Sequence, residues 1–143
     1  MKINDVLRGK GTEVVTISPE ATVSELLALL AEHNVGALVV SADGRSVDGI
    51  VSERDIVRLI HRDAEGLHTQ VAAIMTAEVH TCDPDTHIDD LMRLMTDRRI
   101  RHVPVLKDNA LSGIVSIGDV VKTRIGELEF EREQLSNYIA SSG

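Results

Sequence analysis

The sequence contains very few aromatic residues: Phe130 and Tyr138 are the only ones, and tryptophan is absent. The stacking platforms on which proteins hold single-stranded bases are therefore missing. A basic excess is missing too, since 15 Lys and Arg stand against 23 Asp and Glu, for a formal net charge of −8. Affinity for nucleic acid depends on neutralising phosphates, so general nucleic-acid binding is excluded, whereas a local basic pocket for one small anion is not.

Long apolar runs and cysteine pairs are absent as well. No run approaches the roughly 18 apolar residues of a membrane helix, and the N-terminal stretch MKINDVLRGK is not apolar enough for a signal peptide. Cys82 is the single cysteine, so it cannot form an internal disulfide, which fits a reducing compartment. We therefore expect a cytoplasmic protein without membrane contact, and 143 residues suffice to bury one sizeable core.

An internal repeat organises the chain. The segment VVTISPEATVSELLALLAEHNVGALVV aligns without a gap with VHTCDPDTHIDDLMRLMTDRRIRHVPV, and GIVSERDIV aligns with GIVSIGDVV after a loop shorter by one residue. NDVL and AAIMT are matching lead-in segments upstream of each copy. The sequence thus predicts one repeat over residues 1–66, a second over 67–122 and a C-terminal helical extension over 123–143.

Each copy has the same predicted order of strand, helix, strand, strand and helix. Apolar residues on one helical stripe indicate the first helix of each copy, with a capping box at Thr22 and Glu25 and a weaker one at Thr86 and Asp89. The second helices begin near Glu53 and Ile117. The predicted strands are residues 14–17, 37–40 and 47–52 in the first copy and 79–82, 103–106 and 111–116 in the second.

The predicted fold class is α/β (α+β). One β-α-β-β-α unit exposes too much apolar surface to be stable alone, so the two units are expected to pack face to face about a pseudo-twofold axis. Such an arrangement creates two related clefts between the repeats.

The recurring pattern Gly-Ile-Val-Ser-x-x-Asp ends in Ser52 and Asp55 in the first copy and in Ser116 and Asp119 in the second. A strand that ends in Ser and enters a helix presents free N–H groups, a hydroxyl and a carboxylate at one rim. A carboxylate accepts hydrogen bonds and suits the paired hydroxyls of a ribose. The alternative is that each Ser is simply a helix N-cap with Asp at the third helical position.

With these motifs, the chain from about residue 3 to residue 121 resembles the paired CBS domains (Bateman modules), of the stand-alone bacterial type. The resemblance rests on the Thr and Pro before each first helix, the run from Arg101 to Val105 and the two GIVS-x-x-D endings. It implies regulation rather than catalysis, through an adenine nucleotide: AMP or NAD(H) first, then ATP or S-adenosylmethionine.

Carried over position by position, the resemblance also implies the ligand-binding residues. Asp55 and Asp119 would bind ribose, with Ser52 and Ser116 beside them. The other adenosine-binding positions would be the hydroxyls of Thr16 and Thr81, the backbone at Ala21 and Thr86 against the adenine edge, and the aliphatic pairs Val35 with Ile50 and Ile100 with Ile114.

Cations differ between the copies. Arg101 and His102 match the family's phosphate contacts, and the first copy has Gly36 and Ala37 in their place; conversely, Arg54 of the first copy is replaced by a glycine in the second. Since the axis brings the copies together, Arg54, Arg101 and His102 would bind phosphate groups. The alternative for the arginines around position 100 is a solvated basic helix end.

The sequence gives little indication of metal binding or catalysis. The six histidines show no metal-ligand spacing, and Cys82 is more consistent with a small core residue than with a nucleophile. Gly9-Lys10-Gly11 lacks the spacing of a phosphate-binding loop. No catalytic arrangement is present, and we expect a chain that is not an enzyme, since 143 residues leave no room for an attached catalytic domain.

Beyond the second repeat, one apolar stripe runs through Val121, Ile125, Leu128, Leu135 and Ile139. A long helix with one such seam is expected to pack on its own core or on a second copy of the chain, and homodimers are common among paired CBS domains. The leading hypothesis is a nucleotide sensor for energy status that regulates a partner protein of unknown identity. The alternative is a structural or interaction module that acts through dimerisation and this helix.

Overall fold

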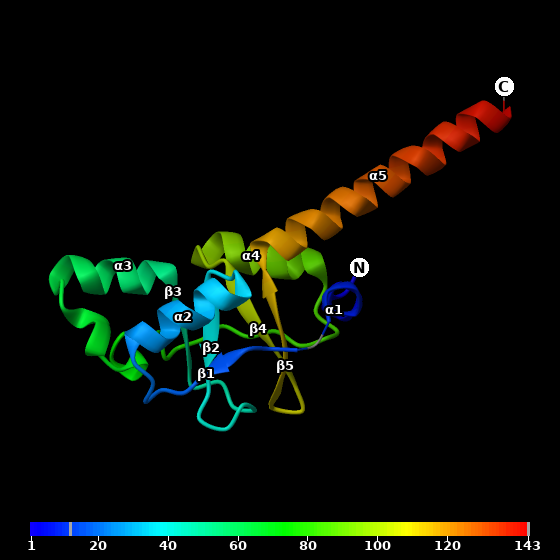
Figure 1. Ribbon diagram of the computed structural model, residues 1–143. Helices are drawn as coiled ribbons and strands as arrows, with labels where there is room; N and C mark the ends of the chain where they lie inside the picture. Colours follow the sequence, from blue (N-terminus) through cyan, green and yellow to red (C-terminus); the bar gives the residue numbers. More distant parts are fainter. Residues whose placement is uncertain (12, 143) are drawn as a thin grey trace.

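The first repeat folds in the predicted order of strand, helix, strand, strand and helix (Figure 1). The computed structural model describes residues 1–11 and 13–142. The elements of this half are α1 (Ile3–Lys10), β1 (Thr16–Ile17), α2 (Val23–His33), β2 (Ala37–Val40), β3 (Gly49–Ser52) and α3 (Glu53–Arg62). Helix α1 is an addition, because the sequence predicts only a lead-in segment there.

The second repeat follows two short 3-10 turns, η1 (Gly66–His68) and η2 (Val71–Ala73). Its elements are α4 (Ile88–Arg98), β4 (His102–Lys107), β5 (Ala110–Ser116) and α5 (Ile117–Ser142). The strand predicted at residues 79–82 is reduced to one parallel bridge between Cys82 and Val105. Thr76 already pairs with Ile50 of the first repeat, so the chain crosses between the repeats here and only its end reaches β4.

Both hairpins use backbone conformations that favour Gly, Asn and Asp. Gly44, in the loop between β2 and β3, has φ +78°, while Asp108 and Asn109, between β4 and β5, have φ +52° and +63°. Asp43 accepts hydrogen bonds from the backbone N–H groups of Ser46 and Arg45, which hold the pKa of its carboxyl well below its usual range.

The two lead-in segments are exchanged between the repeats. The N–H of Ile3 donates to the carbonyl of Thr86 at 2.9 Å, and the N–H of Val71 donates to the carbonyl of Ala21 at 2.8 Å. Ile3 is fully buried in the core of the second repeat, and Val71 is fully buried in that of the first. Each core is thus completed by residues from the chain before the other repeat, which ties the two α/β units into one pair.

The helix caps differ between the copies. Thr22 Oγ1 accepts from the N–H of Glu25 at 3.3 Å, and the Glu25 carboxylate accepts from the N–H of Thr22. The predicted capping box of α2 is therefore confirmed. The weaker box predicted at Thr86 and Asp89 is wrong. Thr86 Oγ1 accepts instead from the N–H of Asp83 at 3.2 Å and closes the preceding turn, and α4 begins one residue later.

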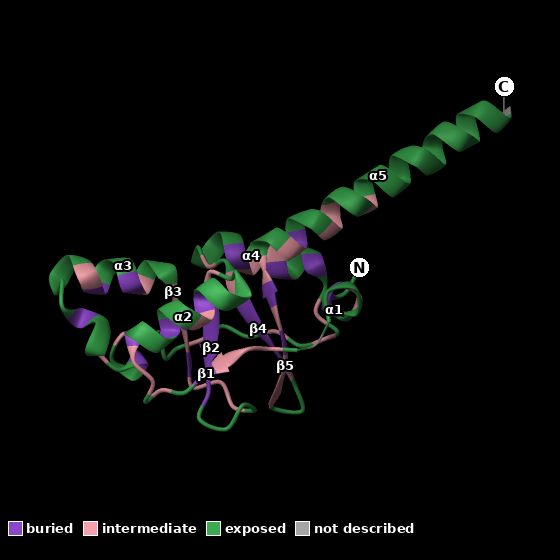
Figure 2. Ribbon diagram, in the orientation of Figure 1, coloured by how far each residue is buried: buried purple, intermediate pink, exposed green. Residues whose placement is uncertain are grey.

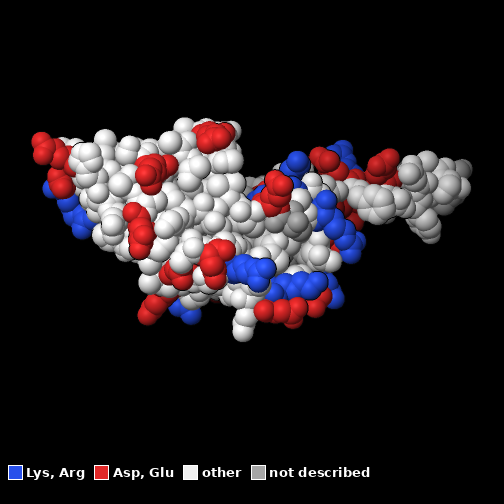
Figure 3. All heavy atoms as spheres, turned by 60° about the horizontal axis from the view of Figure 1, so that its bottom comes forward, with Lys and Arg blue, Asp and Glu red and all other residues white. Residues whose placement is uncertain are grey.

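Helix α5 continues for 26 residues and extends away from the body of the molecule (Figure 1). Its predicted apolar stripe does not pack on the core: Val121, Ile125, Leu128 and Leu135 are 47%, 50%, 53% and 60% exposed (Figure 2). Among the described residues, no helix is both long and apolar enough to cross a bilayer. Acidic and basic side chains are interspersed on the face drawn in Figure 3.

The contact between β3 and the lead-in of the second repeat predicts a sharp effect at Gly49. A Cβ atom there would lie 2.6 Å from Met75 Sδ and 2.8 Å from the carbonyl oxygen of Thr76. We expect Gly49→Ala to lower the free energy of unfolding by about 1–3 kcal/mol in urea denaturation. Gly126→Ala, in α5 with open space around it, should raise it by up to about 1 kcal/mol. Equal stability of the two variants would contradict this packing.

Candidate functional site

A cavity of about 440 Å³ lies between the repeats. In the first repeat, its walls come from Gly36 and Ala37 at the start of β2, the end of β3 and the start of α3; in the second, they come from residues 76, 78–80 and 99–102. The volume falls within the roughly 300–1,000 Å³ that is typical of small-molecule sites. Because both repeats contribute, the cavity exists only in the paired arrangement.

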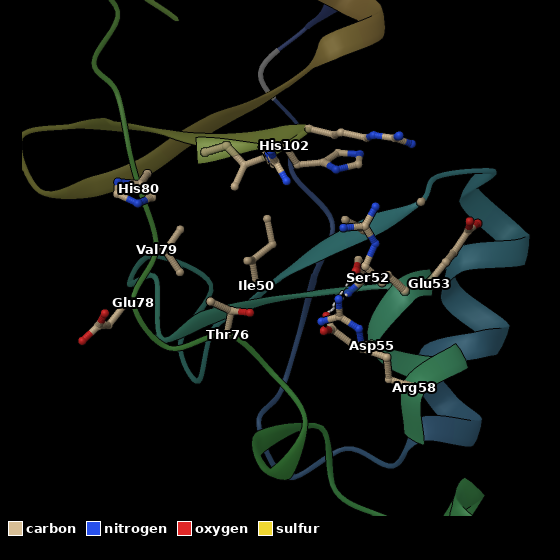
Figure 4. A pocket seen from close by; sticks show the side chains of 16 residues that line it. Ile50, Ser52, Glu53, Asp55, Arg58, Thr76, Glu78, Val79, His80 and His102 are labelled. Atoms are coloured by element: carbon tan, nitrogen blue, oxygen red, sulfur yellow. Dashed lines mark hydrogen bonds between the residues drawn. The ribbon is translucent and has the colours of Figure 1, made fainter. Parts of the chain in front are cut away.

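Asp55 and Ser52 form the polar rim of this cavity, where β3 enters α3 (Figure 4). Asp55 Oδ2 accepts from the N–H of Ser52 at 2.8 Å and from Ser52 Oγ at 3.1 Å. Among the described residues, these are the hydrogen bonds of the Asp55 carboxylate, and both use the same oxygen. The capping role and the ligand-binding role are therefore compatible, since Oδ1 stays available to a hydroxyl donor.

Two isoleucines provide the aliphatic surface of the cavity. Ile50 comes from β3 of the first repeat, and Ile100 from the connection between α4 and β4 in the second. Figure 4 shows Ile50 between Val79 and Ser52, beneath His102. The resemblance instead pairs Val35 with Ile50 and Ile100 with Ile114, within each copy; neither Val35 nor Ile114 lines this cavity.

Basic side chains from both repeats line the cavity, together with the carboxylates of Glu53, Asp55 and Glu78. Arg54 from the first repeat and Arg101 and His102 from the second line it together, so the cations that each copy lacks are supplied by the other. Arg58 and Arg99 add two guanidinium groups that the sequence does not single out as ligands. The basic-helix-end alternative applies to Arg98, which lies in the last turn of α4.

His102 lies where the two clefts meet. Its Cε1 atom is 3.9 Å from the position of a Cβ on Gly36, and it lines the cavity beside Arg101. Burial, followed by the nearby ammonium of Lys10, lowers the pKa of His102 from its ordinary value of 6.5, although Asp119 and Glu53 act in the opposite direction. The imidazole is therefore mainly neutral at pH 7.

Several other candidate residues lie elsewhere. Thr81 and Thr86 line a separate hollow beside Cys82. Thr16 pairs with Val39 inside the first sheet, and Ala21 packs against the core of the first repeat. Ser116 and Asp119 form the equivalent rim in the second repeat, where β5 enters α5, and this rim marks the predicted second cleft.

Four residues of the crossing chain, Thr76, Glu78, Val79 and His80, line the cavity without being predicted. The matching lead-in AAIMT marks the segment in the sequence, but only the exchange between the repeats brings it against β3. The two backbone bonds between Ile50 and Thr76, each 2.9 Å long, hold it there.

Cys82 is half-buried, and burial, reinforced by the charge of Asp83, raises the pKa of its thiol to about 12. The thiolate that a nucleophile or a metal ligand needs is therefore disfavoured, as expected for a small packing residue. The described residues contain no group of three His, Cys, Asp or Glu that could hold a metal ion.

This pair of α/β units, joined across a nucleotide-sized cavity, defines the class of the protein. The family model described as "CBS domain" matches residues 5–62 and again residues 71–126. The chain belongs to the CBS domain family and carries two such domains in tandem.

Known proteins agree with this assignment. The mitochondrial CBS domain-containing protein CBSX3 of Arabidopsis thaliana is 40% identical over 146 residues, which cover 96% of this chain and 71% of that protein. The crystal structure of the CBS-domain containing protein ATU1752 from Agrobacterium tumefaciens is 42% identical, with a TM-score of 0.83 over 87% of this chain and 99% of that one. The CBS domain pair of protein MJ0100, solved with 5′-methylthioadenosine and S-adenosyl-L-methionine, shares the fold: the TM-score is 0.77 at 24% identity, over 89% of this chain and 98% of that one.

The lowered pKa of His102 predicts how stability depends on pH. As the pH falls, the imidazole is protonated in the unfolded chain before it is protonated in the folded chain. The contribution of the neutral His102 to the free energy of unfolding is therefore fully present above about pH 6.5 and is lost as the pH falls below that value. Between about pH 7 and pH 5, the melting temperature should therefore fall less for His102→Gln than for the unmodified protein. His33→Gln, at the exposed end of α2, is the control. An identical fall in all three proteins would contradict the assignment.

Proposed function

We propose that the Asp55 cavity binds an adenine nucleotide as a regulatory ligand, with AMP or NAD(H) preferred over ATP and S-adenosylmethionine. The observation that carries the proposal is the meeting, in one cavity, of a carboxylate with a free oxygen, one isoleucine from each repeat and a group of cations. These three features match the ribose, the base and the phosphate of one ligand.

Each part of the ligand has a proposed place. The ribose hydroxyls donate to Asp55 Oδ1, with the Ser52 hydroxyl beside them. The adenine lies between Ile50 and Ile100, since these aliphatic side chains take the place of the aromatic residues on which bases commonly stack. The phosphate group binds on the side of Arg54, Arg101 and His102, and its negative charge draws a proton to the imidazole.

The proposed role is a non-catalytic, cytoplasmic sensor of energy status that passes its bound state to a regulated protein. The adenosine ligands of MJ0100 support binding of the same chemical class by a CBS pair of this fold. AMP is favoured over S-adenosylmethionine because the cations of the cavity suit a phosphate better than a sulfonium.

Isothermal titration calorimetry with AMP tests the proposed site. Asp55→Ala should weaken binding by about 1–3 kcal/mol, because the buried hydroxyls lose their acceptor. Asp97→Ala, on the exposed side of α4, is the matched control and should bind AMP as the unmodified protein does. If Asp55→Ala lowers the melting temperature and leaves the affinity unchanged, Asp55 is a helix cap and nothing more.

We propose in addition that the chain forms a homodimer through α5. Its exposed leucines and valine repeat at helical spacing on a segment that projects from the body, which suits a helix partner better than solvent. This surface also supports the alternative role of an interaction module, with or without a nucleotide.

The helix surface predicts a change of oligomeric state. Light scattering coupled to gel filtration should show a dimer for the unmodified protein and a monomer for Leu128→Lys, since a buried lysine in the seam lacks a partner charge. Glu129→Lys, which reverses a charge on the neighbouring exposed position, should stay dimeric. A monomeric unmodified protein, or a dimeric Leu128→Lys variant, would refute the α5 interface.

A further inference from the structure

The second cleft contains a cation that the first does not. Asp119 repeats the cap of Asp55, with Oδ2 accepting from the N–H and the hydroxyl of Ser116, each at 2.9 Å. The same oxygen also accepts from Lys10 Nζ at 2.6 Å. Lys10 comes from the end of α1, far away in the sequence, and its ammonium donates a second bond to the carbonyl of Ile114 at 2.8 Å.

The ammonium replaces a backbone contact of the first cleft. There, the carbonyl of Ile50 accepts from the N–H of Thr76 at 2.9 Å. Ile114 is the repeat equivalent of Ile50, and its carbonyl accepts from Lys10 instead. The Lys10 side chain therefore stands where the crossing chain closes the first cleft, and it reaches further, to the carboxylate.

The exchange of lead-in segments explains this difference. Ile3 and Val71 are equivalent, because they donate to Thr86 and Ala21, which correspond in the repeat. The chain from Ile3 to Thr16 is longer than the chain from Val71 to Thr81, and the extra residues extend α1 to Lys10 where the second repeat has only the turn η2.

The contact changes the charge of the second site. The side chains of Lys10 and Asp119 are 35% and 24% exposed, so the ion pair is partly withdrawn from solvent. Burial alone would raise the pKa of Asp119, but the Lys10 and Ser116 donors outweigh it and hold that pKa below its ordinary value. Asp119 is therefore an ionised and internally neutralised carboxylate, whereas Asp55 has no ion pair among the described residues.

We propose that Lys10 is a built-in occupant of the second cleft, which restricts adenosine binding to the Asp55 cavity and limits each chain to a single ligand. This inference rests on the proposed function. A ribose entering at Asp119 must displace the ammonium from both its carboxylate and its carbonyl partner, and Gly118 stands in this repeat where the first has Arg54.

Calorimetry with AMP on the full chain tests the proposal. The unmodified protein and Lys107→Met, which removes an exposed charge outside both clefts, should bind about one AMP per chain. Lys10→Met should bind about two, with the second site at least roughly tenfold tighter than in the unmodified protein. Lys10→Met with Asp55→Ala should keep the new site alone. A stoichiometry of one for Lys10→Met, or of two for the unmodified protein, overturns the proposal.

A ligand-free measurement separates this inference from the proposed function. Carbon-detected NMR titration of the Asp119 carboxyl should give a higher pKa in Lys10→Met than in the unmodified protein or Lys107→Met. An unchanged titration overturns the Lys10 contact. If AMP binds to Lys10→Met but not to the unmodified protein, and adding Asp119→Ala to Lys10→Met abolishes the binding, the Asp55 assignment fails while the role of Lys10 is supported. If neither the unmodified protein nor Lys10→Met binds AMP, both proposals are overturned.

Discussion

Two backbone hydrogen bonds, from Ile3 to Thr86 and from Val71 to Ala21, hold the lead-in segment of each repeat against the other repeat. Each bond seats a fully buried apolar residue in the core of the other repeat, so neither core is complete without the chain that precedes its partner. The segments that follow must then run across the space between the repeats. The walls of both clefts are a consequence: one is closed by Thr76 and its neighbours, the other by Lys10.

Small differences between nearly equal repeats therefore produce two unlike clefts. Arg54 occurs only in the first repeat and Arg101 only in the second, because glycine stands at the equivalent position of the other copy. The pairing of the repeats brings both arginines into the Asp55 cavity. The second repeat has Gly118 where the first has Arg54, and its Asp119 carboxylate is already bound to Lys10. The Asp55 carboxylate thus faces a cavity lined by cations of both repeats, whereas the Asp119 carboxylate is held in an internal ion pair.

Much of this architecture follows from sequence pattern. The constant spacing of the repeat predicts the element order, and Ser52 and Asp55 are placed at a strand-to-helix rim by their position alone. The residue that lies with Ile50 in the cavity could not be predicted in this way, because periodicity shows which face of an element is buried but not which other element covers that face. Ile100, Val79 and Lys10 reach the clefts through long-range crossing of the chain. Hence the pairs expected within each copy do not form the cavity, whereas pairs between copies do.

A crystal structure of the full chain grown with AMP would show which of the two carboxylates, Asp55 or Asp119, holds the ribose. We expect AMP in the cavity between the repeats, with its ribose hydroxyls within hydrogen-bonding distance of Asp55 Oδ1, its phosphate beside Arg101, and Lys10 still bonded to Asp119. AMP bound at Asp119 with Lys10 displaced, while the Asp55 cavity holds no nucleotide, would contradict it.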